Sequence, residues 1–255
     1  MVFSWIKRQR RLQLLETPFP EAWLAHLERN VRHYPRLSPR EQALLRDQLR
    51  VFIAEKYWEG CGGLQLTDEM QVTIAALACL LVLGLEHDYY PRVITILLYP
   101  RHYRLHESEI DELGIVHDPA TRLGEARQQG VVILSWADVL RGARKGKHGQ
   151  NLVLHEFAHQ LDMEDRSIDG TPPLASREAY RRWHQVMTAE YERHVEAAEG
   201  GHATLLDQYG ALNEAEFFAV ATECFFEQPV ELQAGHSELY ALLRDYYHQD
   251  PAAWE

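Results

Sequence analysis

Two histidines with an adjacent glutamate are the residues of this sequence that are best suited to hold a metal ion. His155 and His159 lie four positions apart in the stretch NLVLHEFAHQLD, and Glu156 follows the first of them. On a helix, positions i and i+4 lie one above the other, so the two imidazoles can share a tetrahedral zinc ion. Glu156 lies about 100° round the same helix, beside such an ion, where it can take a proton from a water bound to the zinc. The motif therefore predicts a zinc-dependent hydrolase with two imidazole ligands and a general base.

A catalytic zinc site needs a third protein ligand, and the sequence offers two candidates. The extended motif with a third histidine does not fit, since Asp162 and Asp165 occupy the positions of its glycine and its histidine. Glu178 opens a later helix among arginines, where a solvated first-turn acid is also expected. Glu216 lies among small and aromatic residues, where a carboxylate is costly to bury unless a positive charge meets it. These surroundings favour Glu216, and Glu178 stays as the alternative.

Two further acids could support the ligands without binding the metal. Asp162 lies three residues after His159 and seven after His155, on the helical face of the ligands. Glu223 lies two turns after Glu216 on the later helix. Either acid can hold a ligand imidazole or a neighbouring helix in place by hydrogen bonding. The alternative for both is a buried ion pair between helices.

Several separated motifs together resemble the Mlc titration factor A family of bacterial zinc peptidases. They are HEFAHQLD (155–162), DGTPPL (169–174), DQYGALNEAEFFAVATECFF (207–226), LTDEM (66–70), ILLYP (96–100) and GIVHD (114–118). The resemblance covers most of the chain. It implies a zincin-like peptidase domain, aminopeptidase-type activity, one zinc ion per chain and a protein partner, the glucose-responsive repressor Mlc.

The resemblance also bears on the third ligand. In that family, and in the similar catalytic domain of anthrax lethal factor, this ligand is a glutamate on a later helix with a tyrosine seven residues before it. The matching pair here is Glu216 with Tyr209. The resemblance therefore implies Glu216 as the third ligand and ranks Glu178 second. It further implies that Tyr209 donates a hydrogen bond to the oxyanion that forms during hydrolysis.

The first third of the chain reads as helical. The spacing of apolar residues predicts helices within 20–58, and Ser38 with Glu41 forms a capping box at the start of one of them. After a glycine-rich break, Thr67 opens an apolar helix that is expected to run to Leu85. The longest apolar run is shorter than the roughly 20 residues that cross a bilayer, so no membrane span is expected.

A small sheet is expected after the N-terminal helices. Short β-branched runs predict strands near 93–99 and 131–136, with a third strand at 114–117. The strand at 131–136 would precede the motif helix as an edge strand, where an extended peptide can pair with its backbone. Residues 143–150 read as a loop that leads into the motif helix.

Helical patterns return from Asn151 and continue through the rest of the chain, with breaks at 200–201 and at Pro229. The expected fold class is therefore α+β, a mostly helical zincin-like domain with a small sheet. We expect a helical N-terminal subdomain over 1–90 and the catalytic domain over 91–255, which together form one compact unit.

Composition limits the partners and the compartment. The chain of 255 residues has a formal net charge of -12 at pH 7 and no long basic stripe, which disfavours direct binding of nucleic acid. Its three cysteines fit neither a disulfide framework nor a Cys-x-x-Cys metal site, and its N-terminus lacks the pattern of a secretory signal. A cytoplasmic protein is therefore expected.

The N-terminal residues allow two interpretations. The basic and aromatic residues from Phe3 to Arg11 could form a short amphipathic anchor on a membrane surface. The interpretation that we favour is a terminal segment that docks Trp5 on the core.

Three functional hypotheses follow from the motifs. The first is a zinc-dependent peptidase whose water is deprotonated by Glu156. The second is a binding protein that captures a transcriptional regulator and uses the zinc site for structure or control. The third is a metal-free helical scaffold, against which the intact set of two histidines, a glutamate and a distal acid argues. A Glu156→Gln variant separates the first two, because it should abolish hydrolysis and leave capture intact.

Overall fold

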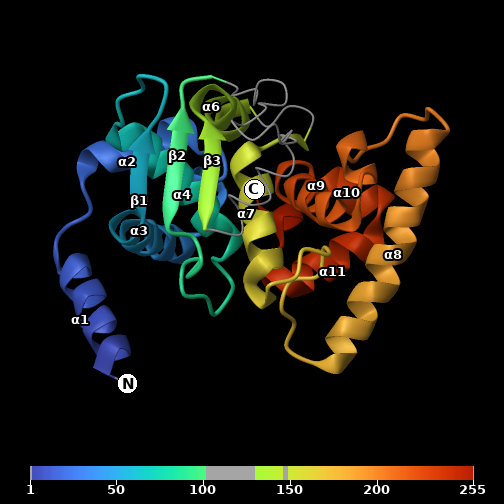
Figure 1. The fold of residues 1–255 in the computed structure, drawn as a ribbon, viewed down its shortest axis with the longest axis horizontal. Coiled ribbons are helices and arrows are strands. Elements are labelled where there is room, and N and C mark those ends of the chain that lie inside the picture. Colours follow the sequence, from blue (N-terminus) through green and yellow to red (C-terminus); the bar gives the residue numbers. More distant parts are fainter. Residues whose placement is uncertain (1, 102–129, 146–148, 255) are drawn as a thin grey trace, which may run out of the picture.

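Helices make up most of this computed structural model, and a small sheet lies among them (Figure 1). The structure describes residues 2–101, 130–145 and 149–254. The helices are α1 (Val2–Glu16), α2 (Glu21–Asn30), α3 (Pro39–Glu55), α4 (Asp68–Leu81), α6 (Trp136–Lys145), α7 (Leu152–Asp162), α8 (Arg177–Glu199), α9 (Glu214–Glu227), α10 (Pro229–Gly235) and α11 (Ser237–Tyr247), with 3-10 turns η1 (Tyr34–Arg36), η3 (Met163–Asp165), η4 (Gln208–Ala211) and η5 (Pro251–Ala253). The mostly helical α+β class expected from the sequence is confirmed.

The strands of the described residues form a parallel sheet in the order β1 (Tyr57–Gly60), β2 (Thr95–Tyr99), β3 (Val131–Ser135). Alternate residues of β2 and β3 are buried, so one face of the sheet packs on the core. The strands expected near 93–99 and 131–136 are confirmed as β2 and β3. The strand expected at 114–117 lies outside the described residues.

The strand β1 was missed, because residues up to 58 were expected to be helical. Helix α3 ends at Glu55, and Tyr57 N donates a hydrogen bond to Ile94 O at 2.9 Å. Cys61 N donates to Leu98 O at 2.8 Å at the other end of the strand. A strand of four residues is too short to show a period of two, and its partner β2 supplies the hydrogen bonds that make it a strand.

Two helix boundaries also differ from expectation. Helix α4 starts after its N-cap Thr67 as expected, but it ends at Leu81 and not at Leu85. A Cβ atom at Gly84 would lie 2.4 Å from Tyr247 O, so beyond the end of α4 the chain approaches Tyr247 closely at a position that only glycine can occupy. The first part of the loop expected over 143–150 is helical, because α6 includes the residues up to Lys145, and residues 146–148 lie outside the described residues.

The N-terminal segment forms a helix whose inward face is charged. Lys7 and Arg11 of α1 make ion pairs of 2.7 and 2.6 Å with Asp88 and Glu55. Trp5 lies on the opposite side of the helix and is 63% exposed, so the expectation that it docks on the core was wrong. In the described residues, no helix is long and apolar enough to cross a membrane.

The motif helix α7 lies between the sheet and the C-terminal helices (Figure 1). Its apolar face enters the core, where the Phe157 ring lies 5.6 Å from Phe52 and 4.8 Å from Tyr90. One buried cluster includes side chains from α2 and α4 together with side chains from α7 and α9. The division of the chain at residue 90 stays a prediction.

Candidate metal centre

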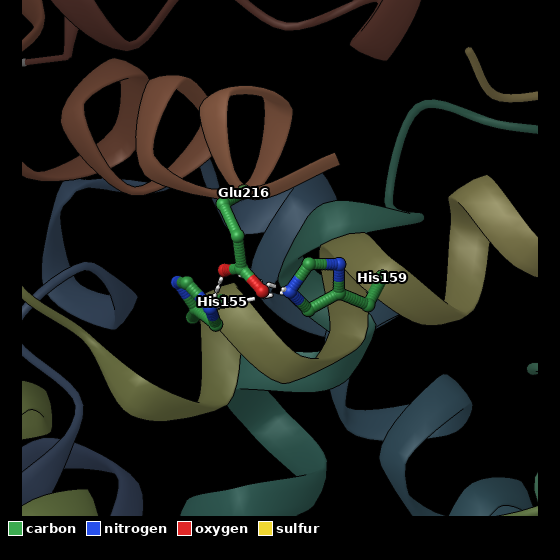
Figure 2. A group of neighbouring side chains, drawn as sticks. All are labelled: His155, His159 and Glu216. Atoms are coloured by element: carbon green, nitrogen blue, oxygen red, sulfur yellow. Dashed lines mark hydrogen bonds and ion pairs between the residues drawn. The ribbon is translucent and has the colours of Figure 1, made fainter. Parts of the chain in front are cut away.

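The helix α7 begins at a polar cap and turns its two motif histidines toward α9. Asn151 is the N-cap, and its side-chain oxygen accepts a hydrogen bond from Leu154 N. With Phe157 directed into the core, the 3.6-residue period directs His155 and His159 to the other side of the helix. Glu216 reaches toward both imidazoles from the first turn of α9 (Figure 2).

Three ligand atoms meet between these two helices. His155 Nε2 and His159 Nε2 lie 3.2 Å apart. Glu216 Oε2 lies 3.0 Å from His155 Nε2 and 3.3 Å from His159 Nε2. Among the described residues, these three side chains form the group that could hold a metal ion. Glu178, the alternative third ligand of the sequence, lies exposed in the first turn of α8.

The spacing of the three atoms fits a small tetrahedral metal ion. With metal–ligand bonds of about 2.0–2.1 Å and tetrahedral angles, two ligand atoms lie roughly 3.3 Å apart. The three separations of 3.2, 3.0 and 3.3 Å are close to that value. Two imidazoles and one carboxylate are also a donor set that suits zinc in catalytic sites.

The first turn of α9 fixes Glu216 in a buried position. Asn213 is the N-cap of α9, and its Oδ1 accepts a hydrogen bond from Glu216 N at 2.9 Å. Glu216 is only 9% exposed, and Ala215, Phe217 and Ala219 beside it are buried. The N-cap and the buried neighbours therefore hold the carboxylate at the imidazoles.

Glu223 holds the second ring nitrogen of His155. His155 Nδ1 donates a hydrogen bond of 2.8 Å to Glu223 Oε1, and Glu223 Oε2 accepts one from Asn151 N. When a cation takes the place of the proton on Nε2, the hydrogen bond to Glu223 keeps the other proton on Nδ1 and leaves the Nε2 lone pair to bind the cation. A carboxylate behind a metal-binding imidazole commonly fixes its tautomer and orientation.

The electrostatics of the centre favour a positive charge between the three side chains. Burial lowers the pKa of His155, but the carboxylates of Glu216 and Glu223 outweigh it and raise this pKa to about 10. Burial opposes ionisation of Glu216, and hydrogen bonds with His155 and His159 hold the pKa of its carboxyl well below its usual range. A divalent cation supplies the positive charge that these groups attract.

Asp162 is the last residue of α7, and its hydrogen bonds go to a loop and not to a ligand imidazole. Its carboxylate accepts hydrogen bonds from Gly170 N at 3.0 Å and Thr171 N at 2.9 Å. A Cβ atom on Gly170 would lie 2.4 Å from Glu214 O, so this loop runs close against the start of α9. Asp162 thereby links the end of the histidine helix to the helix of Glu216.

Tyr209 and Glu156 border the ligands. The Tyr209 ring lies 6.0 Å from the His155 ring and is 52% exposed, so part of it faces solvent. It belongs to the turn η4, in which the Asp207 carboxylate accepts a hydrogen bond from Tyr209 N at 2.9 Å. Glu156 is half-buried on α7 beside His155.

Sequence reasoning missed Asn151 as part of this centre. The signal was present, because an asparagine directly before an apolar helical run is a common N-cap. Its backbone contact with Glu223 had no sequence signal, since it joins residues on separate helices.

Comparisons with known proteins find one family and several relatives. The model of the glucose-regulated metallo-peptidase M90 family matches residues 3–248. An uncharacterised protein of Synechocystis sp. is 39% identical over 244 residues, which cover 95% of this chain and 89% of that protein. The Mlc titration factor A of Edwardsiella ictaluri is 36% identical over 238 residues, with coverages of 92% and 88%. That of Serratia proteamaculans is 34% identical over 229 residues, with coverages of 86% and 85%.

Proposed function

The chain belongs to the glucose-regulated metallo-peptidase M90 family, and from this membership we propose that it is a zinc-dependent peptidase of the aminopeptidase type. The family resemblance inferred from the motifs is thereby confirmed. The observation that carries the proposal for zinc is the near-tetrahedral spacing of His155, His159 and Glu216. We propose these three residues as the ligands of one zinc ion per chain.

Zinc in such a site acts as a Lewis acid on water and on the peptide carbonyl. The side chains around it then have separate tasks. Glu156, next to His155 on α7, accepts the proton of the attacking water and passes it to the leaving amine. Tyr209 donates a hydrogen bond to the oxygen on which negative charge develops. Its position supports this role, because the ring lies near His155 and is partly exposed to solvent.

Glu223 and Asp162 support the ligands in this proposal. Glu223 orients His155 through Nδ1, and Asp162 ties the loop at Gly170 against the start of α9. The substrate is a peptide. In the described residues, β3 pairs with β2 on one side, and the proposal assigns its other side to an extended peptide strand. The compartment that fits the cysteine content is the cytoplasm.

The test of this proposal is the metal content of the purified protein, measured by elemental mass spectrometry. We expect about one zinc per chain, because the described residues contain one such ligand set. Glu216→Ala should lose the zinc. Glu178→Ala is the matched control and should keep it, because Glu178 lies on the surface. Wild-type protein without zinc, or a Glu216→Ala variant that keeps it, contradicts the proposal.

A second function is favoured by the names of the relatives. Several proteins that match most of this chain are named Mlc titration factor A. We propose that this chain also binds a repressor of the Mlc type, without contacting nucleic acid itself, as its net charge of -12 suggests.

A single variant separates the two functions. Glu156→Gln should abolish hydrolysis of aminopeptidase substrates and leave both the zinc content and the capture of the repressor unchanged. If capture is lost with hydrolysis, binding of the repressor depends on the catalytic centre. If hydrolysis survives, Glu156 is not the general base.

A further inference from the structure

A row of three acids runs along one side of α9. Glu216, Glu223 and Glu227 lie within about 40° of one another round the helix, and each is nearly buried. Glu216 and Glu223 meet the histidines of α7. The third acid, Glu227, has no part in the catalytic proposal and contacts no histidine ligand. A buried carboxylate is costly unless cations or hydrogen-bond donors meet it.

Glu227 forms an ion pair with Arg32, a residue of the N-terminal third of the chain. Arg32 directly follows the C-cap of α2, and its Nη2 donates to Glu227 O at 2.8 Å and to the carboxylate Oε2. The Arg32 backbone is held as well, because its N donates to Ala143 O of α6 at 3.2 Å. The Glu227 side chain is fully buried in this pair.

The other oxygen of Glu227 holds the cap of the histidine helix. Asn151 Nδ2 donates to Glu227 Oε1 at 2.8 Å, while Asn151 N donates to Glu223 Oε2. Glu223 and Glu227, one turn apart on α9, therefore both accept hydrogen bonds from Asn151, one from its backbone and one from its side chain. Asn151 Oδ1 in turn caps α7 at Leu154 N. The chain of contacts thus runs from Arg32 to the imidazole of His155.

We propose that Arg32 and Glu227 are positioning residues for the candidate metal centre, which act by holding Asn151 so that Glu223 stays against His155 Nδ1. The inference rests on the proposed zinc site and names two residues that lie outside it. In this arrangement a residue of the N-terminal third of the chain, Arg32, helps to position the metal ligand His155 on α7.

The charges of this region support the proposal. The guanidinium of Arg32 lies against Glu227 at one end of the stripe, and the candidate metal centre would place a cation against Glu216 at the other end. His33 also faces Glu227, but burial lowers the pKa of His33 to about 3, so it stays neutral. Burial raises the pKa of Glu227 to about 7, while Arg32 and the hydrogen bond from Asn151 lower it, so these two residues favour the ionised carboxylate.

The first test compares zinc affinities by competition with a chromophoric chelator. Glu227→Met removes the acceptor for Asn151 Nδ2, and Glu227→Gln keeps an oxygen there. We expect the Met variant to bind zinc about tenfold more weakly, the low end of the effect of hydrogen-bond partners of metal ligands, and the Gln variant to recover most of that loss. Arg32→Gln should resemble Glu227→Met, with partial rescue by Arg32→Lys.

Two further variants make the comparison specific. Asn151→Ser keeps a hydroxyl that can cap α7 and removes the side-chain amide that donates to Glu227. This variant tests the same contact if substitutions of Arg32 or Glu227 prevent folding. Glu190→Gln is the matched control, because Glu190 is a nearly buried acid that contacts Arg193 and His236 away from the centre. Affinity that is the same in the Met, Ser and control variants overturns the proposal.

A second readout needs no metal. In zinc-free protein, the side-chain proton on His155 Nδ1 should give a protected NMR resonance, because it is held by Glu223. The proposal predicts that this resonance broadens or disappears in Asn151→Ser and stays in Glu190→Gln. Wild-type protein that binds no zinc would contradict the proposed function but not the role of this chain of contacts. A resonance that is unchanged in Asn151→Ser would overturn the role of this chain of contacts.

Discussion

His155 is held at both ring nitrogens, and this arrangement defines the chemistry of the centre. Nδ1 donates to Glu223 at 2.8 Å, and Nε2 lies 3.0 Å from the carboxylate of Glu216. The tautomer that results is the one in which Nε2 can bind a cation. The proposed role of the neighbouring Tyr209 can be tested by steady-state kinetics.

Tyr209→Phe should lower kcat and leave KM nearly unchanged. The phenol hydroxyl is proposed to meet charge that exists only in the transition state, and a donor of that kind contributes about 100-fold or more in rate. Steady-state kinetics on an aminopeptidase substrate measure the split, with zinc content as the control. An unchanged kcat, or a loss that falls wholly on KM, would show that the ring only lines the site.

Asp162 gives the fold a pH dependence of definite sign. Burial raises the pKa of its carboxyl to about 6, against the hydrogen bonds from Gly170 and Thr171 that lower it and with Asp169 nearby raising it further. The folded chain thus holds this proton to a higher pH than the unfolded chain, whose carboxyl has a pKa of about 3.9. The resulting stability is fully present below about pH 4 and is lost as pH rises through about 6.

The measurement is urea unfolding of wild type and Asp162→Asn between about pH 4 and about pH 7. The difference in free energy of unfolding, wild type minus variant, should fall by on the order of 3 kcal/mol across this window. The variant does not titrate, so shared contributions cancel. A difference that is flat or rises with pH contradicts the assignment.

At the scale of elements, the centre depends on two capped helices that meet near their N-termini. Asn151 caps α7 and Asn213 caps α9, each by accepting a hydrogen bond from the third residue of its helix. For α9 that third residue is Glu216 itself, so one hydrogen bond both starts the helix and orients the ligand backbone.

Asn213→Ala should therefore cost about 1 kcal/mol of stability and also weaken zinc binding. Asn213→Asp keeps the capping oxygen and should restore both properties. Chemical denaturation gives the stability, and chelator competition gives the affinity. A loss of stability with wild-type affinity would mean that the buried neighbours alone hold Glu216 in place.

At the scale of the whole molecule, the centre joins parts of the chain that are distant in sequence. Helix α7 packs on the core through Phe157, while α9 and its partners cover the other side (Figure 1). A metal bound between α7 and α9 would therefore stabilise the whole fold, since it binds the folded chain and not separated helices.

Zinc added to zinc-free protein should raise the Tm. At a free concentration about 100 times Kd, the gain is about 2.7 kcal/mol. Differential scanning calorimetry measures the shift, and chelation should reverse it. Glu216→Ala should show no shift, whereas Glu178→Ala should behave like wild type because its side chain lies on the surface. An equal shift in both variants would place the zinc elsewhere.

The sequence alone determined the features that depend on neighbours along the chain. The four-residue spacing of His155 and His159 places both imidazoles on one side of any helix. The capping box of Ser38 and Glu41 is present as expected, because its hydrogen bonds lie within a single turn. The apolar surroundings of Glu216 already indicated a buried acid, and the structure brings it to the histidines.

Only the tertiary structure decided which distant side chains meet. The contacts of Glu227 with Arg32 and Asn151 join three separate parts of the chain, and no local period encodes them. The strand β1 exists because β2 supplies its hydrogen bonds, and Trp5 is exposed while Lys7 of the same helix pairs with the distant Asp88. The reason is the same in each case: pairing and burial are set by contacts between segments, whereas caps and helical periods are set by residues within one turn.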